Sequence, residues 1–488
     1  MARNDSVEEV IPSAKRLINS LRSLGYEFPT AVAELVDNSI EYDATEISIK
    51  VEFNGENSWV MIADNGRGMS VEKLKEAMRF GSASVYNERS LGKFGLGLKT
   101  ASFSQCKHWL VATKTDSADN EIISFKWDLD HVNQTDRWEI LPIKKSGLDR
   151  VITDYLQNKK GTVVLWQRLD RILEYDNPNT ERARKKLIAM CRDLEEHLAM
   201  VFHRFLMGEV PGKKIRIFLN DNEIQPWDPF ARNEKATKEL EVIRIPLEHE
   251  GIHGEVVIEP YILPPSKAFS TAQAHSKAAG PKKWNQQQGF YIYRNDRMIQ
   301  SGGWSRIRTY DEHTKLARFA VNFSSKIDGA FKIDVSKMYV SLPQEIRKEV
   351  EDKTQPLVSR AREIYDNDEK SSPAIPSLTT YSQSEVHQQK QIFPGSASGS
   401  TPDSKNLPHI SDSQAGPDNI GIRISRGKAS PHYVIQEEKC LGAEKNWTLD
   451  EIYHELKKNA TPAEIRVLER LFNRLREQLQ KGISDDNL

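Results

Sequence analysis

The sequence predicts an α+β fold with two folded domains, a linker and a small helical C-terminal segment. Apolar residues recur at helical spacing over 6–24, whereas 46–53 and 58–63 have the composition of strands joined by an Asn-Gly turn. Ser, Pro, Gln and Gly dominate between 367 and 416, and such a segment buries too little apolar surface to become ordered. We expect an N-terminal domain at 1–210 and a second α/β domain at 211–366. A disordered low-complexity linker at 367–418 and a C-terminal segment at 419–488 are expected to follow.

The same periodicities predict the remaining elements. Strands are expected at 109–114, 122–127, 162–169, 215–219, 241–246, 255–263, 289–293 and 420–424, helices at 187–206, 343–365, 447–456 and 462–479, and a mobile loop at 271–284. His197 and His203 are six residues apart, which is poor spacing for one helix face, so we expect packing or capping histidines rather than metal ligands.

Composition limits the class of protein. The chain has 488 residues, of which 38% are hydrophobic, and its formal net charge of −1 gives no hint of a nucleic-acid partner. Cys106, Cys191 and Cys440 lie far apart without metal-ligand spacing, which predicts a reducing compartment. Because no apolar run approaches the roughly 18 residues of a membrane span, we expect a cytoplasmic protein without membrane attachment.

Three motifs follow one another near the N-terminus, and the first is Glu34-Leu-Val-Asp37-Asn38. Together with Glu41, its polar residues recur every three or four positions and share one face of a predicted helix. Carboxylates and an amide turned inward suit Mg²⁺, which takes oxygen ligands, and Glu34 is placed to deprotonate a water that attacks a phosphate. Taken alone, the motif also fits a solvated helix face.

The second motif is Asp64-Asn-Gly66-Arg-Gly68-Met69. It follows the short apolar stretch 59–63, so Asp64 is expected at the end of a buried strand. The glycines let the backbone approach a flat ligand closely, and the carboxylate can accept a hydrogen bond from an exocyclic amine such as that of adenine. Asn-Gly is also an ordinary turn signal, so this motif alone leaves a plain turn open.

The third motif is Gly92-Lys93-Phe94-Gly95-Leu96-Gly97-Leu98-Lys99. Glycine-rich backbone before a helix start forms an anion site, and Lys93 and Lys99 add positive charge. The run lacks the spacing of a P-loop, and a glycine-rich loop on its own is weak evidence.

In this order and spacing, the three motifs resemble those of the GHKL ATPases. This superfamily includes gyrase B, the ninety-kilodalton heat-shock chaperones, the histidine kinases, and the MutL and MORC proteins; the chain is most similar to the MORC and MutL branch, including prokaryotic MORC-like proteins. The resemblance implies a Bergerat ATP-binding fold, in which helices cover a mixed sheet, and Mg²⁺-dependent ATP hydrolysis. The resemblance is strong as far as Thr162 and looser from there to about residue 366. One departure is Glu41-Tyr42-Asp43-Ala44, where relatives commonly have Asp-Ala after the first motif.

The resemblance also implies a role for each matching position. Glu34 corresponds to the general base, Asn38 to the Mg²⁺ ligand and Asp64 to the adenine ligand. The adenine-pocket wall corresponds to Gly66, Gly68 and Met69, and the phosphate-binding lid to Gly92, Lys93, Phe94, Gly95, Leu96 and Gly97, with Lys99 close by. The stretch Gly161-Thr162-Val163-Val164 matches the last motif, in which the threonine supports the aspartate and adenine through water.

The second domain resembles the ribosomal-S5-like domain that follows the ATPase in MORC and MutL proteins. Its aromatic strand 289–293 runs into a polar turn that carries Arg294 and Arg297. Farther on, 331–337 resembles the segment that returns a lysine to the γ-phosphate; Lys337 is the best positional match and Lys332 the second. An ordinary surface lysine is the alternative for each.

For the whole chain, the resemblance implies an ATP-dependent homodimer that acts as a nucleotide-gated clamp on DNA or a protein partner, in DNA handling or defence. A chaperone-like ATPase acting on a protein partner is the alternative. A sensor kinase would need a phospho-accepting histidine helix before the ATP site, whereas the first histidine here is His108. A topoisomerase would need an acidic cleavage domain and a strand-breaking tyrosine, for which the C-terminal region offers no matching pattern.

Overall fold

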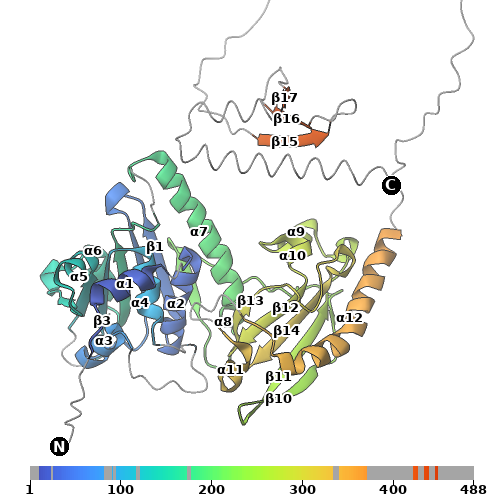
Figure 1. Cartoon of the computed structure of the whole chain (residues 1–488), viewed down its shortest axis with the longest axis horizontal. Helices are drawn as coiled ribbons and strands as arrows, with labels where there is room; N and C mark the ends of the chain where they lie inside the picture. Colours follow the sequence, from blue (N-terminus) through green and yellow to red (C-terminus); the bar gives the residue numbers. More distant parts are fainter. Residues whose placement is uncertain are drawn as a thin grey trace, which may run out of the picture. The chain divides into compact units, whose positions relative to one another are not determined.

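The computed structural model of the chain is shown in Figure 1. It describes residues 10–23, 26–81, 91, 95–116, 121–172, 177–333 and 340–370, together with three short strands near the C-terminus. The chain divides into two compact units, Met1–Thr379 and Thr380–Leu488, and each is described by itself.

The N-terminal part of the first unit is built on an eight-stranded mixed sheet. In sheet order its strands are β5 (Leu141–Pro142), β4 (Ile123–Asp128), β3 (His108–Lys114), β6 (Gly161–Gln167), β2 (Trp59–Asp64), β1 (Glu46–Glu52), β7 (Arg216–Leu219) and β8 (Asn222–Glu223). All neighbours are antiparallel except β1 and β7, which run parallel. The expected strands and the mixed sheet are therefore confirmed.

Both faces of this sheet are buried, which explains why its central strands are apolar throughout. Val60 and Ile62 of β2 and Trp166 of β6 point into the main hydrophobic core, whereas Met61 and Ala63 point into a second core on the opposite face. The helix α6 (Arg150–Leu156) closes that second core. Alternation along the strand thus divides one apolar segment between two cores.

Helices α1 (Ala14–Arg22), α2 (Phe28–Glu41), α4 (Gly97–Gln105) and α7 (Glu181–Val201) gather on the other face of the sheet (Figure 1). Two shorter helices are α3 (Val71–Met78) and α5 (Leu129–Thr135). The Ser70 hydroxyl caps α3 by accepting from the backbone N–H of Lys73. Helix α2 is central in this layer because it packs against both α4 and α7. Nearly all of its side chains are consequently buried, including several polar ones.

A second sheet lies later in the same unit. Its strands are β10 (Ile243–His249), β11 (Ile252–Ile262), β14 (Ala317–Phe323), β12 (Gly289–Arg294) and β13 (Arg297–Gln300) in order, with β9 (Lys238–Glu239) paired to β11. The long helix α12 (Gln344–Lys370) packs on β10 and β14, as the helix expected at 343–365. The mixture of strands and helix agrees with the expected α/β character of this part of the chain.

Two expectations about this region are wrong. The strand expected at 215–219 as the start of the second domain instead pairs with β1, so the first sheet continues beyond residue 211. The segment expected to be a mobile loop contains α9 (Ala272–Ala279) and α10 (Lys283–Gln286). The Thr271 hydroxyl caps α9 by accepting from the backbone N–H of Ala274, and alanines, the best helix formers, continue it.

The two sheets are connected through α8 (His203–Met207), which follows directly on α7. The Nε2 atom of His203 lies 2.9 Å from the hydroxyl of Tyr293 on β12. The next residue, Arg204, donates to the Oδ1 atoms of Asp296 at 3.0 Å and Asn322 at 2.7 Å. His203 is thus a packing histidine, as its spacing from His197 predicts.

The second unit contains a small antiparallel sheet of β15 (Gly421–Arg426), β16 (Tyr433–Glu438) and β17 (Asn446–Thr448). The strand expected at 420–424 is confirmed by β15, whereas the first residues of the helix expected at 447–456 belong to β17. The rest of the two expected helices, and the expected linker, lie outside the described residues. Among the helices that are described, none is long and apolar enough to cross a membrane.

We predict that His203 makes the protein less stable as the pH falls. Burial lowers the pKa of His203 to about 3, so the folded protein keeps it neutral while the unfolded chain protonates it near pH 6.5. Stability should therefore decline from pH 7 to pH 5 by roughly 2 kcal/mol from this residue alone. Urea unfolding at the two pH values measures the decline.

His203→Gln should show a smaller decline, whereas His253→Gln, at an exposed position, should match the wild type. An equal decline in all three proteins would contradict the assignment.

Candidate nucleotide-binding site

Helix α2 turns its acidic residues toward the protein interior. The exposed fraction is 5% for Glu34 and 1% for Asp37, whereas Asn38 is half-buried. A solvated helix face would leave these carboxylates exposed, so that alternative is excluded for Glu34 and Asp37. Asn38, one turn after Glu34, is more exposed than either of the two acidic residues.

Glu34 meets the glycine-rich motif at the start of α4. A Cβ atom placed on Gly97 would lie 2.7 Å from Oε2 of Glu34, closer than real Cβ atoms come to an oxygen. Glycine at this position therefore allows the carboxylate to lie against the N-terminus of the helix. The first and third motifs, more than fifty residues apart in sequence, are in contact at this point.

Asp64 stands at the end of β2, as the apolar run before it predicts. Its Oδ1 atom accepts from the backbone N–H groups of Gly66 at 2.8 Å and Thr162 at 3.2 Å. Its Oδ2 atom accepts from the hydroxyl of Ser39 on α2 at 3.0 Å. Burial raises the pKa of Asp64, and these three hydrogen bonds lower it in part.

Two threonines complete this end of the site. They lie on β6 and β3, the strands that follow β2 in the sheet. Thr162 of β6 is in register with Asp64, and its hydroxyl lies 3.2 Å from that of Thr113 on β3. The Thr113 hydroxyl also accepts from the backbone N–H of Met69 at 3.0 Å. The second motif and the last motif are thus joined through one polar network. Ser39 and Thr113 were not predicted, because an isolated serine or threonine gives no sequence signal.

Gly68 has a φ of 69°, in the left-handed region that favours glycine. A Cβ atom there would also collide with the carbonyl oxygen of Lys114 at the end of β3. The chain after Asp64 therefore passes directly over a neighbouring strand, which a larger residue would prevent. The expected role of the glycines as a wall of the adenine pocket stays a prediction.

Lys99 is directed toward backbone rather than toward open space. Its ammonium donates to the carbonyl oxygens of Ala77 on α3 and of Gly95 in the third motif. Burial lowers the pKa of Lys99 to about 8. In this conformation the lysine holds the glycine-rich turn in place. Its ammonium lies at the carbonyl oxygen of Gly95, next to Leu96, the residue before α4.

Several predicted residues cannot be placed. Gly92, Lys93, Phe94 and Lys337 lie outside the described residues. Lys332, the second match for the lysine of the γ-phosphate, is exposed and ends the short helix α11 (Asp328–Phe331) in a left-handed conformation. Their expected roles stay predictions.

The second sheet contributes two arginines to this region. Arg297 at the start of β13 donates through Nε to both carboxylate oxygens of Asp37, at 3.3 and 3.2 Å. Arg294 at the end of β12 donates to the carbonyl oxygen of Leu91, just before the third motif, at 3.1 Å. The two arginines were noted in sequence only as part of a polar turn, since Asp37 and Leu91 lie more than 200 residues from them. Arg294 also forms an ion pair with the nearer Asp328.

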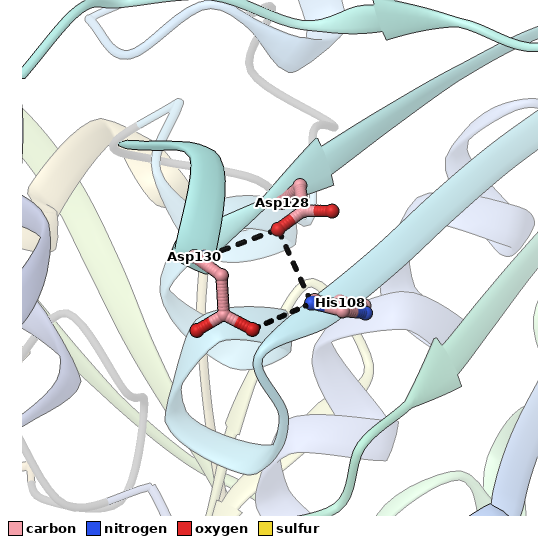
Figure 2. A group of neighbouring side chains, drawn as sticks. All are labelled: His108, Asp128 and Asp130. Atoms are coloured by element: carbon pink, nitrogen blue, oxygen red, sulfur yellow. Dashed lines mark hydrogen bonds and ion pairs between the residues drawn. The ribbon is translucent and has the colours of Figure 1, made fainter. Parts of the chain in front are cut away.

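His108, Asp128 and Asp130 form a separate cluster near the ends of β3 and β4 (Figure 2). Nε2 of His108 lies 3.2 Å from a carboxylate oxygen of each aspartate. Asp128 also caps α5 by accepting from the N–H groups of Asp130 and His131, and it accepts from the ammonium of Lys126 at 2.9 Å. A metal ion would have to displace these donors, so the cluster is explained as a helix cap.

Comparison with known proteins agrees with this geometry. Residues 26–162, which contain all three motifs and end at Thr162, match the family described as "Histidine kinase-, DNA gyrase B-, and HSP90-like ATPase". The chain carries a GHKL ATPase domain. Its eight-stranded mixed sheet with helices packed on it is consistent with the Bergerat fold of that superfamily.

Two relatives support the MORC and MutL branch of the GHKL ATPases. The chain is 34% identical over 88 residues to "ATPase morc-1" of Caenorhabditis elegans, a match that covers 18% of this chain and 10% of that protein. It is 26% identical over 202 residues to "DNA mismatch repair protein MutL" of Thermosipho melanesiensis, covering 40% of this chain and 31% of that protein. The chain thus spans less than a third of the length of either relative.

We predict that Asp64→Asn weakens ATP binding by about tenfold or more, because a charge-assisted hydrogen bond contributes about 1.5 kcal/mol or more. One of the two acceptor oxygens becomes an NH₂ group, so the side chain loses an acceptor, either for the adenine amine and Ser39 at Oδ2 or for Gly66 and Thr162 at Oδ1. Calorimetric titration with ATP measures the change. Asp43→Asn, at an exposed aspartate nearby, is the matched control. Equal affinity in Asp64→Asn and the wild type would place the adenine elsewhere.

Proposed function

We propose that this protein binds ATP with Mg²⁺ and hydrolyses it at a site formed by α2, β2 and the start of α4. The observation that carries the proposal is that α2 reaches both ends of the site. Its Ser39 holds Asp64, and its Glu34 lies against Gly97. These two positions are separated by about 7.5 Å along the helix axis. A nucleotide lying beside the helix would therefore meet a buried carboxylate at each end.

At one end, the adenine amine would donate to Oδ2 of Asp64, since a carboxylate oxygen that accepts from Ser39 can accept a second hydrogen bond. At the other end, the phosphates would lie at the N-terminus of α4, where backbone N–H groups and the helix dipole favour an anion. Gly95 and Gly97 would allow the phosphates to approach the backbone closely. Lys93 and Gly92 are proposed to complete this cradle.

Hydrolysis would use Glu34 as the general base. Its carboxylate takes a proton from water while the water oxygen attacks the γ-phosphorus, and the bond to the β–γ bridging oxygen breaks to release ADP and inorganic phosphate. The half-buried Asn38 offers an amide oxygen of the kind that Mg²⁺ accepts, and the bound ion would neutralise phosphate charge. Lys337, or Lys332 in its place, is proposed to reach the γ-phosphate from the second domain.

We further propose that ATP binding closes a homodimer and that this dimer acts as a clamp on DNA. The support is the similarity to a MORC ATPase and to a protein named for DNA mismatch repair. Both matches cover only part of those proteins.

Glu34→Gln should bind ATP with nearly wild-type affinity and lose turnover by at least about a hundredfold, because the amide cannot accept the proton of the attacking water. ATP should then remain bound, and light scattering should report a dimer that persists with ATP. Phosphate release measures turnover. Glu27→Gln, at the exposed residue before α2, is the matched control and should behave as the wild type.

Wild-type turnover in Glu34→Gln would remove this residue from the reaction. If Glu34→Gln loses turnover but light scattering reports a monomer at saturating ATP, the proposed ATPase activity stands and the proposed clamp is wrong.

A further inference from the structure

Arg297 lies where the second sheet meets the catalytic helix. It begins β13 directly after a two-residue turn at Asn295 and Asp296, whose φ angles of 47° and 67° are both left-handed. Such a turn makes a tight hairpin, so Arg294 and Arg297 face each other as the last register pair of β12 and β13. From this hairpin end Arg297 contacts Asp37 of α2, whereas Arg294 contacts both Asp328 of α11 and the carbonyl oxygen of Leu91.

The contacts of Arg297 are with carboxylates of α2. Nε lies 3.2 Å from Oδ2 of Asp37, and Nη2 lies 4.0 Å from Oε1 of Glu34. The exposed side-chain fractions are 4% for Arg297, 1% for Asp37 and 6% for Glu34. Charges excluded from water in this way interact strongly and leave little freedom of position.

The remaining guanidinium nitrogen is also engaged, because Nη1 donates to the carbonyl oxygen of Met298 at 3.2 Å. The guanidinium group also lies 5.9 Å from the centre of the Phe202 ring. With all three nitrogens directed at protein groups, this arginine is oriented for carboxylates and not for a phosphate.

We propose that Arg297 is the positioning residue of the general base. It fixes Asp37 by an ion pair and places a cation beside one oxygen of Glu34, while Gly97 bounds the other oxygen. Glu34 is thereby held in place at the phosphate end of the site. This role rests on the proposed ATP hydrolysis and makes turnover depend on docking of the second sheet.

The other titratable neighbour of this group is His197 on α7, which lies close enough to both Arg297 and Asp37 to feel their charges. Burial lowers the pKa of His197 to about 4, so it carries no charge at neutral pH. Arg297 therefore provides a positive charge beside both carboxylates of α2.

The test compares ATP affinity, kcat and unfolding for a set of variants. Arg297→Met should lower kcat by about tenfold to a hundredfold, as loss of a residue that orients a reacting group does, and change ATP affinity by less than about threefold. Arg297→Lys, which keeps the charge, should recover part of the rate.

A second variant separates positioning from folding. Arg297→Met leaves Asp37 buried without its cation, whereas Arg297→Met with Asp37→Leu replaces the ion pair by apolar groups and should regain stability. The double variant should remain slow, since Glu34 still lacks its cation. Arg244→Met, which removes an exposed ion pair of the same sheet, is the matched control and should match the wild type.

Wild-type kcat in Arg297→Met, or recovery of kcat together with stability in the double variant, would overturn the proposal and leave Arg297 a structural residue. These outcomes differ from failure of the proposed function, in which the wild type has no ATPase activity or Glu34→Gln keeps it.

Discussion

The structure depends on how two buried carboxylates of one helix are neutralised. Glu34 and Asp37 lie on the inner face of α2, within a layer of helices that excludes water. A buried charge without a partner costs several kcal/mol, so a cation must be supplied. It comes from Arg297 of the second sheet. Arg297 of the second sheet thus supplies a positive charge at the position where the proposed base acts.

The nucleobase end follows a different principle, because Asp64 is held by neutral donors. Two backbone N–H groups and one hydroxyl hold its carboxylate in the sheet, and none of these three donors is a cation. Such an arrangement keeps acceptor capacity for a neutral donor such as an amine. One end of the site is therefore balanced by charge and the other by hydrogen bonds.

Much of this could be predicted from sequence where the signal is local. The apolar run before Asp64 placed it at a strand end, and the polar spacing on α2 placed Glu34 and Asp37 on one face. The parallel pairing of β7 with β1 could not be predicted, because it joins segments about 170 residues apart without a local pattern. The partners of Arg297 and Lys99 were missed for the same reason. The helix α9 was missed although Thr271 and the alanines after it carry a recognisable start signal.

The most direct test is a crystal structure of the chain with Mg²⁺ and a non-hydrolysable ATP analogue. We expect the adenine amine within hydrogen-bond distance of Asp64, the terminal phosphate between Gly97 and Glu34, and Arg297 still bound to Asp37. A nucleotide whose phosphates lie away from Glu34, or an Arg297 that has left Asp37 to bind the phosphate, would contradict the account.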